Sequence, residues 1–158
     1  MGPVSPTGAG REPEALRAPE CLRLLGTRDV GRIAFTAGAL PVLQPVSYLL
    51  SGQELLVPVD ARSELADAAR AAVLALQVDD VDADGRTGWD VTVLGPSRLV
   101  HDPDQVARLD RWGVRPWFPA TRHCYVMLRA ATLSGRRLRT GPAPRPSTGT
   151  TSVPIWAR

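Results

Sequence analysis

The sequence has no lysine and no asparagine, and all 19 of its basic residues are arginines. Because arginine codons are rich in G and C whereas lysine codons are not, this absence indicates a GC-rich genome and says little about function. The net charge is +3, but the arginines are scattered, and the one dense group is Arg136, Arg137 and Arg139. Nucleic-acid binding needs basic residues gathered on one face, so we interpret this group as the solvated end of a strand.

Cysteine and histidine are scarce, with two residues of each. Two cysteines cannot build a disulfide framework, and Cys21 and Cys124 lack metal-ligand spacing. Cys21 lies at helical spacing from leucines, which predicts a core position. Cys124 adjoins His123 in an apparent strand, where neighbouring side chains point to opposite faces. The sequence therefore does not support a cysteine nucleophile, a zinc enzyme or a hydrolase.

Long apolar runs are absent too, and a run such as Ala71–Leu76 falls far short of the ~20 residues that a membrane span needs. No basic segment followed by an apolar stretch marks a secretory signal, so we expect a cytoplasmic protein. The length of 158 residues is that of one domain. Composition predicts a disordered leader over residues 1–16, a folded domain over 17–139 and a Pro/Ser/Thr-rich tail over 140–158. In this tail, Ile155 and Trp156 offer an apolar segment that a partner subunit could bind.

Hydrophobic periodicity predicts a mainly β domain with a few short helices. The first helix is expected around Cys21–Leu25, and Pro45 requires its strand to lie at a sheet edge or a bulge. Strands are predicted over 31–37, 40–50, 54–59, 73–78 and 89–100 (with a bulge or kink at Gly95-Pro96) and within 121–138, and helices over 61–72 and 102–112. Early tight hairpins argue against a parallel sheet. Closing six or seven antiparallel strands into a barrel removes exposed edges.

Two segments have the composition of functional motifs. Asp80-x-Asp82-x-Asp84-Gly85 matches the first half of a calcium-binding EF-hand loop, but Val91 stands where the bidentate glutamate belongs. We therefore interpret residues 79–85 as a solvated hairpin turn. Three aromatic residues gather among prolines, at Trp112, Trp117 and Phe118. They form either a packed loop that closes one end of the barrel or an aromatic wall over a planar ligand.

Five segments, taken in order, resemble the pyridoxamine 5′-phosphate oxidase-like flavoproteins of actinobacterial type. They are Glu20–Leu25 with Val30-Gly-Arg-Ile-Ala34, then Gln44-Pro-Val-Ser-Tyr48 leading to Gly52, then Arg86–Gly95, then Val114-Arg-Pro-Trp-Phe-Pro119, and finally Ser134-Gly-Arg-Arg-Leu138. The resemblance extends from about residue 18 to residue 139. Each segment alone is a weak signal, whereas five in the right order with plausible spacing are specific for the fold.

The resemblance implies an antiparallel split β-barrel that forms a homodimer and holds FMN at the dimer interface. It implies flavin contacts from the first two strands, the loop after the third strand and the later tryptophan-bearing segments. The residues that it nominates are Arg32, Ile33, Val46, Ser47, Val59, Arg62, Ser63, Trp89, Asp90 and Trp117. It implies a small-molecule substrate whose identity the sequence does not give, and it nominates no acid or base, no metal and no nucleic-acid or membrane partner.

The loop after the third strand, Val57–Leu65, departs from the family pattern. Family members commonly carry an Arg and a Lys that neutralise the FMN phosphate, and the aligned positions here are Pro58 and Glu64. A proline offers no N–H donor and a glutamate repels a phosphate. Arg62, Ser63 and main-chain donors would then have to hold the phosphate.

Three functions follow as hypotheses. The first is an FMN-dependent oxidoreductase, in which the cofactor performs the hydride chemistry. The second is a non-catalytic module, or one that binds a deazaflavin or another small ligand, because Pro58 and Glu64 weaken FMN binding. The third is haem binding through His101 or His123, as in distant relatives of the fold.

Overall fold

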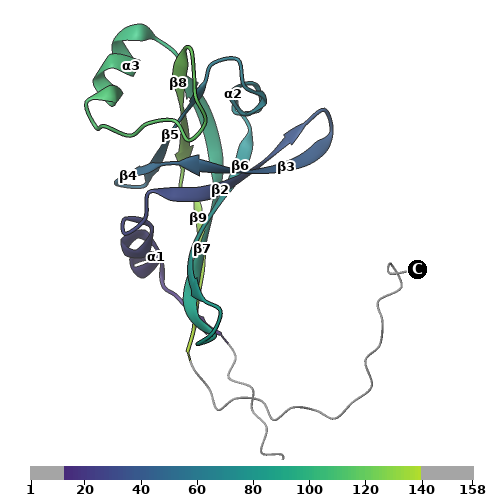
Figure 1. Cartoon of the computed structure of the whole chain (residues 1–158), viewed down its shortest axis with the longest axis vertical. Coiled ribbons are helices and arrows are strands. Elements are labelled where there is room, and N and C mark those ends of the chain that lie inside the picture. Colours follow the sequence, from purple (N-terminus) through teal and green to yellow (C-terminus); the bar gives the residue numbers. More distant parts are fainter. Residues whose placement is uncertain (1–12, 140–158) are drawn as a thin grey trace, which may run out of the picture.

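The computed structural model describes residues 13–139, and its framework is a curved antiparallel sheet (Figure 1). The elements, in chain order, are β1 Glu14–Ala15, α1 Ala18–Leu25, β2 Val30–Ala37, β3 Leu40–Ser47, β4 Leu49–Ser51, β5 Glu54–Asp60, α2 Glu64–Ala68, β6 Val73–Asp82, β7 Thr87–Val100, α3 Pro103–Asp110, β8 His123–Arg129 and β9 Thr132–Leu138. The prediction of a mainly β domain with short helices is confirmed. Over the described range, no helix has the length and apolarity that a membrane crossing requires.

The strands are arranged in the order β3-β2-β6-β7-β8-β5-β4, with β1 and β9 as a branch from β7. The two ends of this order, β3 and β4, are separated in the chain by Tyr48 alone, so the sheet curls back on itself as a split β-barrel. β7 pairs with β9 along its first part and with β8 over its last residues, and so joins the two halves of the barrel. The described strands number nine rather than six or seven, because the sequence did not reveal the short β1 and β4.

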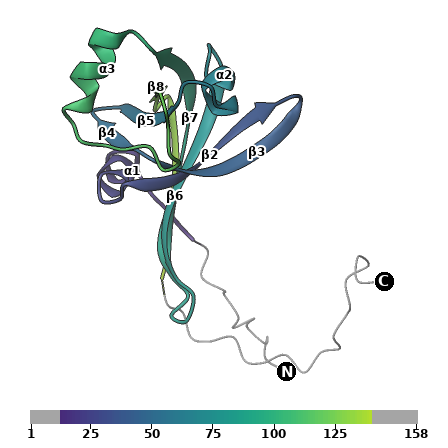
Figure 2. The same ribbon diagram turned by 45° about the horizontal axis from the view of Figure 1, so that its top comes forward.

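The core lies inside the curve of the sheet, where alternate residues of β2, β6 and β7 are buried. β5 and β8 are each buried over five consecutive residues. Ile33 and Phe35 of β2 and Val91 and Val93 of β7 are 0 to 6% exposed. Helices close the openings: α1 packs against β9 and β7, and α2 packs against β2, β5 and β8. Figure 2 shows these helices and α3 around the barrel, with the β2–β3 and β6–β7 hairpins projecting from it.

The single strand predicted over 40–50 is wrong at Tyr48, where the chain divides into β3 and β4. The main-chain N–H of Tyr48 donates to Asp29 O at 2.9 Å, and its phenol donates to Leu25 O at 2.6 Å. These two bonds hold Tyr48 against the loop between α1 and β2. Burial raises the pKa of the Tyr48 phenol above its ordinary value.

Two further predicted boundaries need correction. The second helix covers Glu64–Ala68 rather than 61–72. Its N-cap is Ser63, whose Oγ accepts the N–H of Ala66 at 3.1 Å. The helix cannot extend through Ala71, because the φ angle of Ala71 is 58°. The acidic turn expected over 79–85 is also shorter, because β6 extends to Asp82, which pairs with Thr87.

Other predictions agree with the structure. Helix α3 starts at the expected cap, where the Asp102 carboxylate accepts the N–H of Gln105 at 3.0 Å. Pro45 lies on β3, at one end of the strand order, and Cys21 and Cys124 are both free and buried.

The leader predicted over 1–16 is too long, because Glu14–Ala15 pairs with β9. Residues 1–12 and the tail 140–158, with Ile155 and Trp156, lie outside the described residues.

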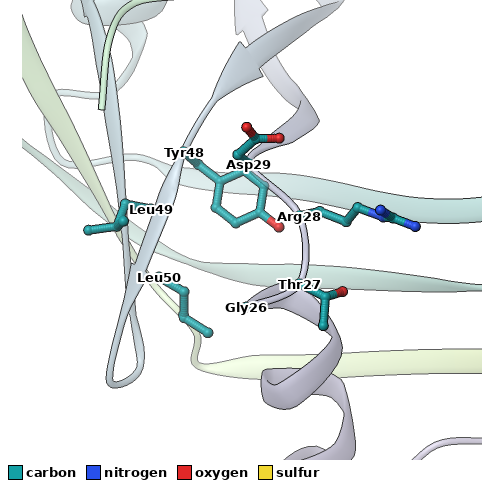
Figure 3. Close-up of a pocket in the computed structure, with 7 residues that line it drawn as sticks. All are labelled: Gly26, Thr27, Arg28, Asp29, Tyr48, Leu49 and Leu50. Atoms are coloured by element: carbon teal, nitrogen blue, oxygen red, sulfur yellow. The ribbon is translucent and has the colours of Figure 1, made fainter. Parts of the chain in front are cut away.

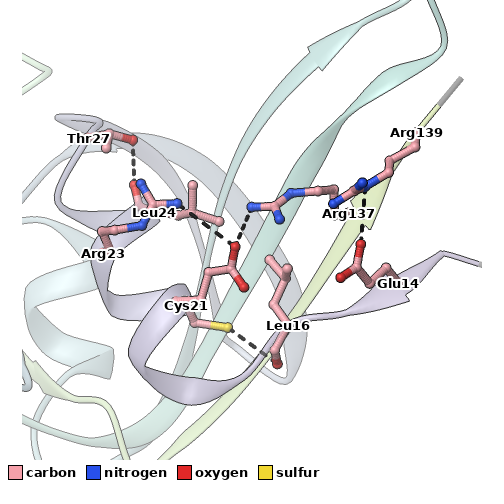
Figure 4. Close-up of polar contacts among 9 residues, drawn as sticks. Glu14, Leu16, Cys21, Arg23, Leu24, Thr27, Arg137 and Arg139 are labelled. Carbon is pink, nitrogen blue, oxygen red and sulfur yellow. Dashed lines mark hydrogen bonds and ion pairs between the residues drawn. The ribbon is translucent and has the colours of Figure 1, made fainter.

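The arginine group at the end of β9 binds carboxylates of neighbouring elements (Figure 4). Arg137 pairs with Glu20 of α1, and Arg139 pairs with Glu14 of β1 at 3.2 Å. Arg136 pairs with Asp90 of β7 at 3.1 Å. Exposed pairs of this kind contribute little to stability. These arginines neutralise nearby acids, which agrees with the interpretation of a solvated strand end.

Candidate functional site

The outer face of the sheet carries an exposed apolar surface. Leu43, Ala34, Ala75 and Leu94 are successive Cα partners across β3, β2, β6 and β7. The strand neighbours of Ala34 and Ala75 are core residues, so these two side chains point outward. Their ladder partners Leu43 and Leu94 lie on the same face. With the adjoining Pro41, Val73 and Pro96 these four residues make up a surface that we call the apolar band. Leu43 is 64%, Val73 70% and Leu94 43% exposed.

A charged row crosses the same outer face at one end of the apolar band. Asp79 of β6 and Asp90 of β7 are direct partners in the ladder. Arg32 lies 3.5 Å from Asp79, and Arg136 lies 3.1 Å from Asp90. Ser47 also belongs to this face. The structure therefore brings three of the nominated residues, Arg32, Ser47 and Asp90, to one side of the sheet.

Other nominated residues on the strands are part of the core. Ile33 is 0%, Val46 2% and Val59 6% exposed, and all three pack in the main hydrophobic cluster. Trp89 is half-buried and packs against the same cluster. Ligand contacts of Ile33, Val46 and Val59 could come only from their main-chain atoms.

The nominated loop residues Arg62 and Ser63 lie between β5 and α2, in a network centred on Asp60. The Asp60 carboxylate accepts the N–H of Arg62 at 2.7 Å through one oxygen and the N–H of Thr121 at 3.1 Å through the other. The Ser63 hydroxyl donates to the main-chain oxygen of Asp60 at 2.7 Å. Hydrogen bonds from the loop, that of Arg62 first, lower the pKa of Asp60. Asp60 was missed in the sequence, although an Asp side chain in a turn often accepts the main-chain N–H two residues on.

The two positions that depart from the family pattern have different surroundings. Pro58 is buried within β5, where its ladder partner is Tyr125 of β8. Glu64 is the first residue of α2 and is exposed. Neither side chain supplies a hydrogen-bond donor toward the β5–α2 loop.

Trp117 lies in the connection between α3 and β8, four residues before Thr121. It is 50% exposed, and its neighbours Trp112 and Phe118 are 51% and 53% exposed. These aromatic side chains are about half exposed, which favours the aromatic-wall alternative over the packed-loop alternative. They leave an aromatic surface beside the segment that Asp60 binds.

A shallow pocket of about 420 Å³ lies between the α1–β2 loop and the start of β4 (Figure 3). Its wall includes Gly26, Thr27, Arg28, Asp29 and Tyr48. Arg28 is paired with Asp80, and the Tyr48 phenol is bound to Leu25 O. The Arg28 guanidinium and the Tyr48 phenol are thus bound within the chain, and the nominated residues lie elsewhere.

His123 belongs to a polar cluster beneath α3. Its Nε2 lies 2.8 Å from Asp110 Oδ1, and the same oxygen accepts the Tyr125 hydroxyl at 2.8 Å. Hydrogen bonds from His123 and Tyr125 lower the pKa of Asp110, with His123 as the larger cause. The other histidine, His101, is exposed. Within residues 13–139, no group of three or more His, Cys, Asp or Glu side chains is placed to hold a metal ion.

This cluster leads to a prediction about acid stability. Because the folded pKa of Asp110 is depressed, its carboxylate stabilises the fold above the ordinary Asp pKa of about 4. That contribution is lost as the pH falls through the lower folded pKa. Asp110→Asn should destabilise the protein at neutral pH by about 1 kcal/mol, after allowance for solvent screening. Urea unfolding from pH 7 to pH 2 should show the two proteins converging at the acid end. A difference that stays constant with pH would contradict this role.

Comparisons with known proteins agree on one family. Residues 17–137 match the model of the family described as pyridoxamine 5′-phosphate oxidase. An uncharacterized protein of Mycobacterium tuberculosis is 34% identical over 140 residues, which is 85% of this chain and 91% of that protein. The FAD binding protein from Mycobacterium smegmatis is 27% identical with a TM-score of 0.64, over 80% of this chain and 98% of that one. An FAD-binding protein from Mesorhizobium loti shares the fold, with 23% identity and a TM-score of 0.63 over 79% of this chain and 97% of that one.

Proposed function

Because the chain belongs to the pyridoxamine 5′-phosphate oxidase family, we propose that it binds a flavin between two copies of itself and uses it in an oxidoreductase reaction. The observation that carries the proposal is the match to the Mycobacterium smegmatis protein, which binds FAD and is covered over 98% of its length.

The apolar band supports the dimer. Single exposed leucines are ordinary, whereas a contiguous row with flanking prolines and valine marks an interaction surface. Leu43 and Leu94 flank Ala34 and Ala75 in this row. The alanine side chains are short, so the surface is lower between the two leucines. A stable interface buries roughly 800 Å² on each partner, and a second copy is the occupant that family membership favours.

The flavin would lie where the charged row meets the edge of the apolar band, which the second copy covers. Small side chains at Ala34 and Ala75 suit a planar ring, and Arg32 carries N–H donors that suit ring carbonyl oxygens. Ser47 adds a hydroxyl on the same face. The ring therefore fits the residues present, whereas the phosphate of FMN does not fit the β5–α2 loop, whose donors Asp60 already occupies.

The division of labour follows from this arrangement. A bound flavin supplies hydride transfer, and the protein supplies position and electrostatics. Arg32 and Asp90 set the charge beside the ring, each held by a partner of opposite charge. The paired dimer face excludes water from the ring. The cofactor is proposed as FMN or a related flavin, and the substrate as a small molecule.

A non-catalytic binding module, or one that takes a deazaflavin, is the second candidate. The observation that favours it is the loop itself, where Pro58 has no N–H and Asp60 binds the main-chain donors. A protein that binds only the ring of its ligand, and no phosphate, would not need hydrogen-bond donors in this loop. An absence of turnover with bound flavin present would favour this candidate.

The test is the cofactor content of the purified full chain. We expect a yellow protein with about one flavin per protomer, identified by chromatography after denaturation. Light scattering on the same sample should give the mass of two chains. A colourless protein that releases no heat on titration with riboflavin, FMN or FAD would refute the flavin proposal, and heat released by a deazaflavin instead would support the second candidate.

A further inference from the structure

Two chain segments meet at one corner of the barrel, at the loop between β5 and α2 and at the approach to β8. Asp60 and His123 are ladder partners, so both segments leave the sheet at the same edge. The N–H of Ala61 extends the ladder by one bond, to Arg122 O at 2.8 Å. The Asp60 carboxylate then joins the two segments, with one oxygen on each.

The Asp60 carboxylate occupies the position from which a bound anion would accept hydrogen bonds from this corner. Two main-chain N–H groups, those of Arg62 and Thr121, converge on it from different segments. The next N–H group, that of Ser63, donates to Asp60 O at 3.0 Å. The main-chain N–H donors of residues 61–63 are therefore all satisfied within the chain. The ionised form of Asp60 is favoured, because these hydrogen bonds lower its pKa.

Two acids, Asp60 and Glu64, outnumber the single cation of residues 60–64, so the net charge of this segment opposes a phosphate. Glu64 lies four residues after Asp60 and adds a second negative charge, which is exposed. Arg62 is the cation of the loop, and its charge lowers the pKa of Asp60. A phosphate monoester carries between one and two negative charges at neutral pH. It would have to displace Asp60 from its donors and would then lie beside two carboxylates.

We infer that Asp60 is a built-in anion that prevents this loop from binding a phosphate, so the protein selects its flavin by the ring and not by a terminal phosphate. Riboflavin and FMN should then bind almost equally. This inference rests on the proposed flavin function for its ligand, but the exclusion of phosphate by Asp60 can be measured without a flavin.

The first experiment compares riboflavin and FMN by calorimetry on the full chain. The wild type should bind the two ligands within about threefold of each other. Asp60→Asn removes the negative charge and leaves one side-chain acceptor instead of two, so at least one of the two N–H donors becomes available to a phosphate. The affinity for FMN should then rise about tenfold or more while that for riboflavin stays unchanged, because a hydrogen bond to a charged group is a strong one. Asp67→Asn is the matched control, since it removes an exposed carboxylate of α2 and should keep the wild-type ratio.

The second experiment measures thermal unfolding in inorganic phosphate and in chloride at matched ionic strength. Phosphate should stabilise Asp60→Asn, and also Asp60→Ser if the first variant does not fold, but not the wild type. A wild type that phosphate stabilises, or that binds FMN tenfold tighter than riboflavin, would overturn the inference, as would variants that gain nothing. If neither the wild type nor any of the variants binds a flavin, the proposed function fails. The unfolding result in phosphate alone then decides the role of Asp60.

Discussion

Replacing Gly95 by alanine is expected to destabilise the protein by about 3 kcal/mol or more, at the upper end of what overpacking does. A Cβ at this position would lie 1.8 Å from the carbonyl oxygen of Arg129 and 3.0 Å from its carbonyl carbon. Both are main-chain atoms, so rotation of a flexible side chain cannot relieve the clash. Gly95 stands where β7 passes from its partner β9 to its partner β8, and the chain that links β8 to β9 crosses directly over it.

The matched control is Gly26→Ala, because Gly26 has φ −70° and an added Cβ would meet its nearest atom at 3.5 Å. That variant should unfold within about 0.5 kcal/mol of the wild type, as a surface change normally does. Guanidinium unfolding of the three proteins provides the measurement. A Gly95→Ala protein with the wild-type midpoint would show that the crossing is looser than the distances indicate.

Gly95 also shows what the sequence can and cannot predict about the fold. The pair Gly95-Pro96 was predicted as a bulge or kink, and the position is indeed special. The reason lies in Arg129, 34 residues further along the chain, and no local pattern contains that contact. β2, which alternates clearly, and β5, a short apolar run that follows the turn at Ser51-Gly52, were predicted almost to the residue. The division at Tyr48 was missed, because its cause is a bond to Leu25 in another element.

The candidate site was predictable to a similar degree. The resemblance nominated neighbouring pairs, Arg32 with Ile33 and Val46 with Ser47. Adjacent residues of a strand point to opposite faces, so one member of each pair had to be buried. The register identifies Ile33 and Val46 as the buried members. Asp60 could not be found in this way, because its second donor, Thr121, is 61 residues distant.

The apolar band makes a second prediction with a large effect, on assembly and cofactor binding together. The double substitution Leu43→Glu and Leu94→Glu should convert a dimer into monomers and release the flavin. Both side chains are exposed in the single chain, at 64% and 43%, so the barrel itself should still fold. In a two-fold dimer each substitution occurs twice, which places four carboxylates without partners in the interface.

An unpaired buried charge costs several kcal/mol, so the dimer dissociation constant should rise by at least about a thousandfold. Leu40→Glu is the matched control. Leu40 belongs to the same strand and is 68% exposed, but it lies on the opposite side of β3, at the hairpin tip. It should leave mass and flavin content unchanged. Light scattering over a range of concentrations, with flavin absorbance on each peak, makes the measurement. A double variant that remains a flavin-loaded dimer would show that the band is not the interface, and the flavin would then have to be sought on another face of the barrel.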